Sequence, residues 1–552
     1  MISKNYADLP LSPGATDRAV ELSLRNRRPV GPLDVTVLSR VAATAATDPQ
    51  HVAVRDGDSC LTYRDLLNRV ERICRTLRGL GHGAGDVIAV AGDRSAETVA
   101  LFLALEHLGA CYLPIDCDWP EQRINEVLRR AGAVRLIDYA AAAGVPGRAA
   151  VASKAAAEAD IPVSDACPPG GDAWSGEGSA TGRANEVRYC IFTSGTTGRP
   201  KGAAVEHQGM LNHLWAKVAD LDLSGADRLA FTAPLVFDIS IWQMLAPLLC
   251  GGTVEVVGPE DLAYPRRLTT RLESAGVTVV ELVPTVAGWI AREAERRGAS
   301  ILPQLRWLIS TGEELPPQLA ERLLGALPHV RLLNAYGPTE CSDDVTHHEV
   351  TTADLTLPRL PVGAPIANAD LYLLVREDTG QWRAAEPQEA GELFVGGPAV
   401  GLGYANDEEN TAAAFYRDPF DPSSLTGRLY RTGDAASFDG AVVRYLGRLD
   451  RQVKVAGVRM ELDEIEAVLR RHDAIAACAV TLIDSGGRAG LAAHYVAARP
   501  VDAEELRSYL AAALPEAMVP RHLVERAALP LTPNGKTDHR ALRAELSRAT
   551  ES

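Results

Sequence analysis

The most informative stretch of the chain is YCIFTSGTTGRPKGAAVEH, at residues 189–207. A strand-like apolar run, a loop dense in Gly, Ser and Thr, and a helix opening near Gly209 are expected in that order. Glycines let the backbone curl so that successive N–H groups converge, while hydroxyl groups and a lysine add donors and positive charge. This composition favours polyphosphate binding. The spacing differs from G-x-x-x-x-G-K-[ST], so the common NTPase loop is excluded.

On both sides of this stretch, helical periods alternate with short β-branched runs, a rhythm typical of parallel sheets. It predicts an α/β fold. Helices are expected at residues 61–80, 98–108 and 120–131, and strands at 87–90, 134–137, 187–192, 253–257, 277–283 and 305–309. A Pro-, Gly- and Ser-rich segment at 162–186 is expected to be a long surface loop.

The pattern changes twice towards the C-terminus. From about residue 371, short strands separated by Gly-rich turns indicate a β-rich subdomain, and a helical and alternating region follows from 463. We therefore predict three parts: an N-terminal surface arm at 1–35 with a solvated basic cluster, a large domain at 36–449 and a small α+β domain at 450–552. The basic cluster consists of Arg25, Arg27 and Arg28.

Composition narrows the class of protein. The net charge of −16 would repel a phosphate backbone, so nucleic-acid binding is not expected. The nine cysteines form no C-x-x-C pair and read as reduced thiols rather than a disulfide or zinc framework. Neither a secretory signal nor a membrane-spanning run is evident. These features predict a cytoplasmic protein without a membrane partner.

Several motifs together resemble the adenylate-forming superfamily, and most closely its amino-acid-activating adenylation domains of nonribosomal peptide synthetases. The motifs occur in the family's order over residues 61–540. They are LTYRDL at 61–66, TSGTTGRPKG at 193–202, FDIS at 237–240, NAYGPTE at 334–340, GELFVGGPAVGLGY at 391–404, YRTGD at 430–434, GRLDRQVKVAGVRMELDEIE at 447–466 and PNGKTDHR at 533–540. The resemblance implies a large core domain and a small mobile C-terminal domain.

This resemblance also implies the reaction of a carboxylate with Mg·ATP to give an acyl-adenylate and pyrophosphate. Lys536 resembles the catalytic lysine, Glu340 the Mg²⁺ ligand, Asp434 the acceptor of the ribose hydroxyls and Asp450 the hinge of the small domain. The residues expected to bind ATP or AMP are Thr193, Ser194, Gly195, Thr196, Thr197, Gly198, Lys201, Gly312, Asn334, Ala335, Tyr336, Thr339, Asp434, Tyr445, Arg448 and Lys454.

The family's amino-acid pocket maps onto Asp238, Ile239, Trp242, Glu281, Ile309, Thr311, Ala335, Asp343 and Asp344. Asp238 matches the residue that pairs with the substrate α-ammonium. Glu281 interrupts an apolar run that reads as a buried strand, where a lone carboxylate is costly, so something cationic is expected to meet it. A second ammonium on the substrate would satisfy this need, and Trp242 would shorten the pocket. One of Asp343 and Asp344 is expected to point to solvent.

A short cationic amino acid is therefore the predicted substrate, with 2,4-diaminobutyrate first. Diaminopropionate and ornithine come next, then lysine and β-lysine. No carrier, condensation or thioesterase motif is evident, so the chain resembles a free-standing enzyme that loads the phosphopantetheine thiol of a separate carrier protein. An MbtH-like helper stays open. Two other classes stay open as well: a ligase that passes the acyl group to coenzyme A or a free amine, and a noncatalytic binding protein.

Overall fold

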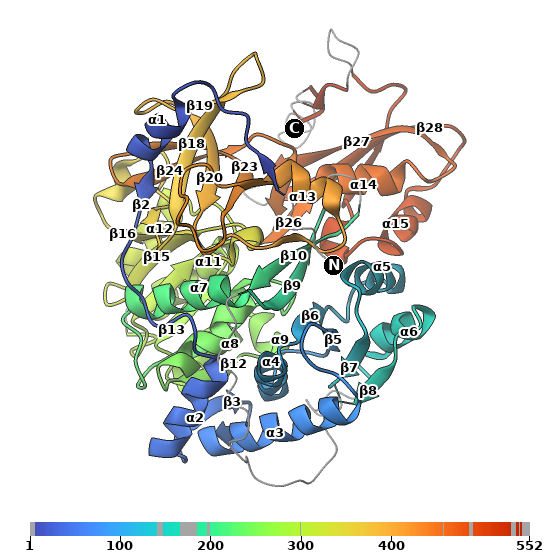
Figure 1. Ribbon diagram of the computed structural model, residues 1–552. Helices are drawn as coiled ribbons and strands as arrows, with labels where there is room; N and C mark the ends of the chain where they lie inside the picture. Colours follow the sequence, from blue (N-terminus) through green and yellow to red (C-terminus); the bar gives the residue numbers. More distant parts are fainter. Residues whose placement is uncertain are drawn as a thin grey trace.

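A computed structural model describes residues 6–140, 147–165, 185–195, 199–298, 300–455, 457–484, 489–530, 537–539 and 541–543. Within these residues the chain folds into two large, mainly parallel sheets, an antiparallel sheet and two small C-terminal sheets (Figure 1). The predicted α/β rhythm is thus present. No helix among the described residues is both long and apolar enough to cross a membrane.

The first large sheet has the strand order β21-β10-β9-β6-β5-β7-β8. Its strands β5 to β9 run parallel, and β10 and β21 are antiparallel additions at one edge. The strands are β5 (Val87–Ala91), β6 (Cys111–Ile115), β7 (Arg135–Asp138), β8 (Val163–Asp165), β9 (Val187–Thr193), β10 (Lys201–Glu206) and β21 (Gly403–Tyr404).

The second large sheet has the order β17-β16-β15-β14-β13-β11-β12-β3-β4 and is parallel from β3 to β15. Its strands are β3 (Val52–Asp56), β4 (Ser59–Thr62), β11 (Arg228–Phe231), β12 (Thr253–Val256), β13 (Val279–Leu282), β14 (Trp307–Ser310), β15 (Arg331–Tyr336), β16 (Thr346–Val350) and β17 (Ala364–Pro365).

Helices between the two sheets form the main core. Leu103 of α4, Leu211 of α7 and Leu245 of α8 are buried in one cluster together with Val90 of the first sheet and Leu229 of the second. Almost every residue of α4 is buried, because the helix has a sheet on each side. The helices of this layer are α2 (Val37–Thr47), α3 (Tyr63–Gly79), α4 (Ala96–Leu108), α7 (His207–Asp220) and α8 (Ile239–Leu249).

Two further helical layers cover the outer faces of the sheets. The helices α5 (Glu121–Ala131) and α6 (Ala150–Glu158) pack on the first sheet. On the second sheet lie α9 (Pro259–Leu262), α10 (Pro265–Ser274), α11 (Pro284–Arg297) and α12 (Pro317–Ala326). Both parallel sheets are therefore buried on their two faces, as parallel sheets require.

The β-rich part is one sheet with the order β1-β22-β23-β20-β18-β19, joined by β2 and β24, and it is antiparallel except for the β1–β22 pair. It contains β1 (Ala7–Asp8), β2 (Leu24–Arg25), β18 (Asp370–Arg376), β19 (Trp382–Ala384), β20 (Gly391–Gly396), β22 (Phe415–Arg417), β23 (Arg428–Asp439) and β24 (Val442–Arg448), with α1 (Ala15–Leu22) and α13 (Glu408–Ala414) beside it. The predicted β-rich region is confirmed.

The N-terminal segment packs against the β-rich sheet, which its sequence pattern did not predict. Helix α1 packs beside β18 and β19 (Figure 1), where Ala19 is buried with Tyr372. The basic cluster is not merely solvated either. Arg27 pairs with the buried carboxylates of Asp370 and Asp421, and Arg28 pairs with Asp220 of α7. Ion pairs and apolar contacts with distant parts of the chain leave no periodic pattern in the sequence. The hydrophobic pattern therefore did not predict how the N-terminal segment packs.

The C-terminal part has its own core. A hairpin of β25 (Gln452–Val455) and β26 (Val458–Glu461) leads into α14 (Leu462–Leu469), and a three-stranded sheet follows. The sheet contains β27 (Ile475–Asp484), β28 (Ala489–Ala497) and β29 (His522–Glu525), and α15 (Ala503–Ala511) packs with it. Figure 1 shows this part above α5, with β26 beside β10.

Candidate functional site

The candidate phosphate loop joins two antiparallel strands, β9 and β10, in which Thr193 pairs with Lys201. Strand β10 begins inside the quoted motif, so a second strand lies between the loop and α7, where the sequence predicted a direct passage to a helix. Ser194 and Gly195 are the described residues of the loop next to β9. The candidate residues Thr196, Thr197 and Gly198 lie outside the described part of the chain.

The C-terminal hairpin and α14 contact this loop directly. Ser194 Oγ accepts a hydrogen bond from the Glu461 N–H at 2.9 Å, and the Gly195 N–H donates to the Glu464 carboxylate at 3.1 Å. Lys201 Nζ lies 3.7 Å from Glu461 Oε1. The groups that could hold phosphate oxygens therefore already have partners within the protein. The Gly195 N–H and the Lys201 ammonium lie on the carboxylates of Glu464 and Glu461. Ser194 Oγ accepts from the Glu461 N–H.

Glu340 is buried within a short 3₁₀ helix (Thr339–Cys341) and is held from two sides. Tyr404 donates to its Oε1 at 2.7 Å, and Arg459 of β26 donates to its Oε2 at 2.7 Å. Burial alone would raise the pKa of Glu340, but Arg459 and then Lys201 outweigh burial and lower the pKa to about 2. The group is therefore an ionised oxygen ligand at neutral pH, and a protein cation currently lies against it.

Three candidate nucleotide residues meet at Asp434. The Tyr336 hydroxyl donates to its Oδ2 at 2.5 Å, and Arg448 Nη1 donates to its Oδ1 at 2.9 Å. The rings of Tyr336 and Tyr445 lie 5.9 Å apart between centroids. Arg448 also donates to Asp450 at 2.9 Å, so the candidate hinge residue is tied to the same cluster. The structure brings these five residues together.

The other candidate nucleotide-binding residues do not belong to the Asp434 cluster. The Asn334 side chain donates to the Pro361 carbonyl at 2.8 Å, which uses its amide within the protein. Gly312 has φ +84° in the turn after β14, a conformation that favours glycine. Lys454 of β25 is exposed and interacts electrostatically with Asp434 and Asp238. The predicted catalytic residue, Lys536, lies outside the described residues.

The candidate substrate residues lie where neighbouring parallel strands end. Glu281 pairs in register with Ile309 on β13 and β14, and Thr311 follows β14 directly. Ala335 is near the end of β15, the next strand. Ligands of open α/β sheets bind outside the carboxyl ends of the strands, so this is the expected edge for a substrate.

Asp238 is the N-cap of α8 at the same edge. Its carboxylate accepts the Ile239 N–H at 3.0 Å and is hydrogen-bonded by Thr339. Burial, followed by the nearby negative charge of Asp344, raises the pKa of Asp238 despite these hydrogen bonds. A cation beside Asp238 would relieve both effects.

Lys217 of α7 lies in the centre of the carboxylate cluster, and the sequence motifs did not indicate it. Its Nζ lies 2.5 Å from Asp344 Oδ2, 3.5 Å from Glu281 Oε1 and 4.5 Å from the centre of the Trp242 indole, and its side chain is 0% exposed. The Trp242 indole N–H also donates to Glu281. The chain itself therefore places a cation beside Glu281, where the sequence predicted that something cationic would meet it and suggested a second substrate ammonium.

A second correction concerns Asp343 and Asp344, which are 4% and 1% exposed. Neither points to solvent, because the turn after Glu340 folds back against α7. A signal for these contacts was present in the sequence of α7. His213, Lys217 and Asp220 recur at helical spacing along α7, which places these polar groups on one face of the helix.

A series of ion pairs extends from Asp344 to the surface. His347 lies 3.7 Å from Asp344 through Nε2 and 2.8 Å from Asp220 through Nδ1, and Asp220 in turn pairs with Arg28. Burial opposes the charge of His347, but its contacts with the two aspartates raise its pKa. A line of alternating charges therefore connects the candidate site to the N-terminal segment.

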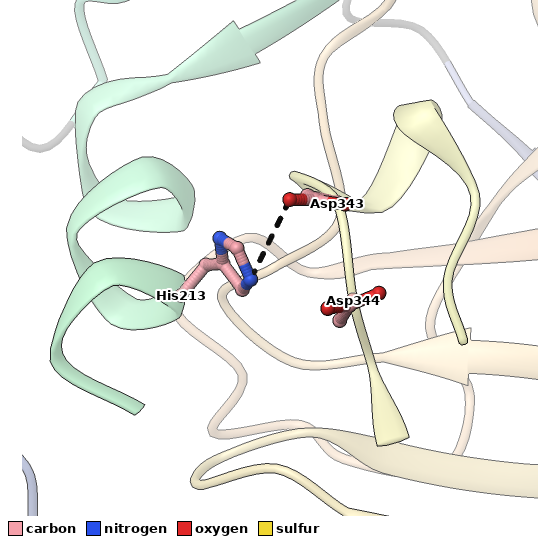
Figure 2. Close-up of side chains that lie close together, drawn as sticks. All are labelled: His213, Asp343 and Asp344. Carbon is pink, nitrogen blue, oxygen red and sulfur yellow. Dashed lines mark ion pairs between the residues drawn. The ribbon is translucent and has the colours of Figure 1, made fainter. Parts of the chain in front are cut away.

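His213, Asp343 and Asp344 also form a possible metal-ligand group, with ligand atoms within 4.8 Å of one another. Figure 2 shows the His213 ring on α7 facing Asp343, at 3.8 Å between Nε2 and Oδ2. The ammonium of Lys217 already lies on Asp344, so a divalent cation there would meet like charge at short range. The ammonium of Lys217 therefore disfavours a divalent metal ion at Asp344.

Comparison with known proteins places this arrangement in a family. Residues 41–405 match the profile of the AMP-binding enzyme family, and residues 464–536 match that of the AMP-binding enzyme C-terminal domain. The chain belongs to the AMP-binding enzyme family. Members of this family form adenylates from ATP, and the two matched segments correspond to the core and C-terminal subdomain of the superfamily's fold.

Two curated relatives are synthetases. The chain is 38% identical to phosphinothricin tripeptide synthetase PhsB of Streptomyces viridochromogenes over 97% of its length. It is 33% identical to tyrocidine synthase 2 of Brevibacillus parabrevis over 92% of its length. The chain spans 44% and 14% of the lengths of these two relatives.

Solved structures agree on the fold. A nonribosomal peptide synthetase protein containing adenylation and PCP domains, PA1221, matches with a TM-score of 0.77 and 29% identity, over 93% of this chain and 84% of that one. The Vibrio cholerae adenylation domain AlmE, in complex with glycyl-adenosine-5'-phosphate, has a TM-score of 0.79 at 23% identity, over 94% and 99% of the two chains, and supports the fold alone. The predicted family and fold class are confirmed.

Proposed function

We propose that the protein activates an amino acid as its aminoacyl-adenylate and passes it to the phosphopantetheine thiol of a carrier protein. The observation that carries this proposal is the buried carboxylate of Asp238 at the carboxyl-end edge of the second sheet, beside Thr339. A buried carboxylate at this edge recognises a substrate ammonium. The relatives that contain adenylation and carrier domains support the carrier as partner.

In the first step, a carboxylate oxygen of the amino acid attacks the α-phosphorus of ATP, and the bond to the β-phosphate oxygen breaks to release pyrophosphate. Ser194, Gly195 and Lys201 would hold the phosphates, and Asp434 would accept the ribose hydroxyls. Lys536 would bridge the reacting carboxylate and α-phosphate. Such a reaction depends mainly on positioning and charge neutralisation.

Glu340 suits the Mg²⁺ that this reaction requires. It is ionised and Tyr404 orients one of its oxygens, while the other is available whenever Arg459 withdraws. Bound there, the metal would neutralise phosphate charge.

In the second step, the carrier thiol attacks the carbonyl carbon of the adenylate, the bond to the AMP oxygen breaks, and the thiol proton is lost to solvent. β26 and α14 contact Ser194 and Gly195 of the candidate phosphate loop. These contacts support a role for the C-terminal part in the second step, after pyrophosphate has left the loop.

The substrate we propose is a short diamino acid, with 2,4-diaminobutyrate first, then diaminopropionate and ornithine. Four carboxylates gather at the substrate position, namely Asp238, Glu281, Asp343 and Asp344. Lys217 balances one of them and the substrate α-ammonium a second. The remaining negative charge favours a second ammonium on the substrate. Trp242, fully buried against Glu281, limits the reach of the side chain.

Amino-acid-dependent ATP–pyrophosphate exchange tests the proposal directly. The panel contains diaminobutyrate, diaminopropionate, ornithine, lysine, β-lysine, 2-aminobutyrate, serine and threonine. Exchange that is strongest with a short diamino acid is the expected result. Preference for serine or threonine would reject the cationic substrate but keep amino-acid activation, and absence of exchange with every amino acid would reject activation itself. Transfer to a purified carrier protein then tests the second step.

The pH dependence of substrate affinity is a separate prediction. Burial, offset by Lys217 and reinforced by Asp344, raises the pKa of Glu281 to about 7 from its ordinary 4.5. Trp242 and His347 also face this carboxyl group, and both favour its ionised form. The folded protein therefore binds more protons than the unfolded chain between pH 4.5 and about 7, so the stability of the empty protein falls as pH rises through that window.

Ionisation of Glu281 adds a negative charge to the cluster around the proposed substrate ammonium, so affinity for a cationic substrate should rise as pH increases. We expect the KM for diaminobutyrate to fall about tenfold between pH 6 and pH 8, with a much smaller change for 2-aminobutyrate. Exchange kinetics at constant ionic strength measure both values. In Glu281→Gln, which does not titrate, this difference between the two substrates should disappear. A persistent difference would show that another group is responsible.

A further inference from the structure

Lys217 does more than compensate buried charge. It lies outside the family's pocket positions, on a helix that the resemblance did not implicate, and its ammonium is placed between Glu281 and Asp344. Those two carboxylates project from β13 and from the turn before β16. The indole of Trp242 covers the same ammonium, and Thr311 donates to the other oxygen of Asp344 at 3.3 Å. The ammonium therefore occupies the best cation position in the cluster.

Asp343 differs from both of these carboxylates. Its Oδ2 is buried and, unlike Glu281 Oε1 and Asp344 Oδ2, has no lysine or arginine nitrogen within ion-pair distance among the described residues. It lies 3.8 Å from His213 Nε2, beyond hydrogen-bond distance (Figure 2). The backbone at Asp343 has φ +91°, a conformation rarely adopted by an aspartate, and it holds the side chain in this buried position.

We propose that Lys217 is a specificity-determining residue that holds Glu281 and Asp344, occupies the cation position between them and leaves Asp343 to receive the side-chain ammonium of a short diamino acid. This inference rests on the proposed amino-acid activation. An amine at Asp343 would not share that carboxylate with the ammonium of Lys217. The amine of a longer substrate must share Glu281 and Asp344 with the ammonium of Lys217, and two like charges at that range repel strongly in a buried setting.

His213 fits the same arrangement. Burial lowers its pKa to about 3, and the positive charge of Lys217 adds to this effect, so the imidazole stays neutral beside Asp343. A neutral ring does not neutralise the carboxylate. Burial, followed by the negative charge of Asp344, raises the pKa of Asp343 well above its usual range, so a substrate ammonium beside it would favour its ionised form. The site thus contains one carboxylate pair satisfied within the chain and one carboxylate prepared for the substrate.

Substitutions at Asp343 and Lys217 test the inference. Asp343→Asn keeps the shape and removes the charge, so kcat/KM for diaminobutyrate should fall about 100-fold, mainly through KM. The fall for 2-aminobutyrate, which has no side-chain amine, should be at least about tenfold smaller. Asp418→Asn is a matched control, because Asp418 is also a buried carboxyl group but lies in the β-rich sheet region. It should not change the ratio of the two substrates.

Lys217→Met keeps a similar length and removes the ammonium. The ornithine-to-diaminobutyrate ratio of kcat/KM should rise at least about tenfold, because the longer amine can then occupy the position between Glu281 and Asp344. Since this change leaves two buried carboxylates unpaired, circular dichroism checks folding. The double variant Lys217→Met with Asp344→Asn restores the charge balance and should shift the ratio in the same direction.

The outcomes separate this inference from the proposed function. Equal losses on both substrates in Asp343→Asn, or an unchanged ornithine ratio in both folded Lys217 variants, would overturn the inference while leaving amino-acid activation intact. Absence of wild-type exchange with every amino acid would overturn the function and the inference together. Isothermal titration of diaminobutyrate into wild-type protein and Asp343→Asn gives a readout that does not depend on turnover.

Discussion

Asp238→Asn should reduce amino-acid-dependent ATP–pyrophosphate exchange by at least about 100-fold for every amino acid, because it removes the buried charge that we assign to the α-ammonium. The substitution separates two roles of this residue. An asparagine oxygen can still accept the Ile239 N–H and cap α8, so the local fold should persist. The loss should therefore arise from the charge and appear mainly in the KM for the amino acid, with the KM for ATP changed little.

A neighbouring substitution controls for disturbance of α8. Ser240 is buried and its hydroxyl donates to the Leu235 carbonyl at 3.2 Å, away from the carboxylate cluster. Ser240→Ala should cost only a few-fold in exchange. If Asp238→Asn lost no more than Ser240→Ala, the α-ammonium would have to be recognised elsewhere. Thermal unfolding of both variants would show whether α8 keeps its stability.

The second large effect concerns Arg459, which links the C-terminal hairpin to Glu340. Arg459→Met should leave Glu340 buried with Tyr404 as its remaining hydrogen-bond partner, and breaking such a buried pair costs roughly 3–5 kcal/mol. We expect this cost to fall on the contact between the hairpin and the phosphate loop. Limited proteolysis and denaturant unfolding, each with and without Mg²⁺, measure it.

Mg²⁺ provides the discriminating comparison. It should protect Arg459→Met more than the wild-type protein, because Glu340 no longer has a protein cation on it and can bind a metal instead. Arg470→Met is a suitable control, since Arg470 makes a half-exposed pair with Glu466 on α14 and such pairs contribute about 0–1 kcal/mol. Equal Mg²⁺ protection of all three proteins would contradict the competition between Arg459 and a metal.

Much of the fold was predictable because burial on both faces gives parallel strands a continuous apolar run. The strands at β5, β9, β12, β13 and β14 and the helices α3 to α5 were found within a few residues of their bounds. What failed was the start of β10 within the phosphate motif, since glycine and lysine carry no strand signal. The packing of the N-terminal segment was not predicted for a related reason. It depends on contacts with β18 and α7, which lie far away in the sequence.

The candidate site was predictable only where a residue is unusual for its place in the sequence pattern. Glu281 stood out because a carboxylate interrupts a buried strand, and that oddity correctly indicated a nearby cation. Which cation it was could not be read from the sequence, because Lys217 lies 64 residues earlier on another element. The spacing of polar residues along α7 identifies a polar face, whereas its partner is fixed only by packing between the two sheets.

The N-terminal segment also has a meaning for protein engineering. The match to the AMP-binding profile begins at residue 41, yet residues before it complete the β-rich sheet and supply Arg28 to the charged line that ends at Asp344. A module exchanged at the profile boundary would therefore lose a counter-charge that reaches the candidate site. Exchanges of such modules should begin before β1, so that the transplanted unit keeps both its sheet edge and the electrostatic setting of its own substrate residues.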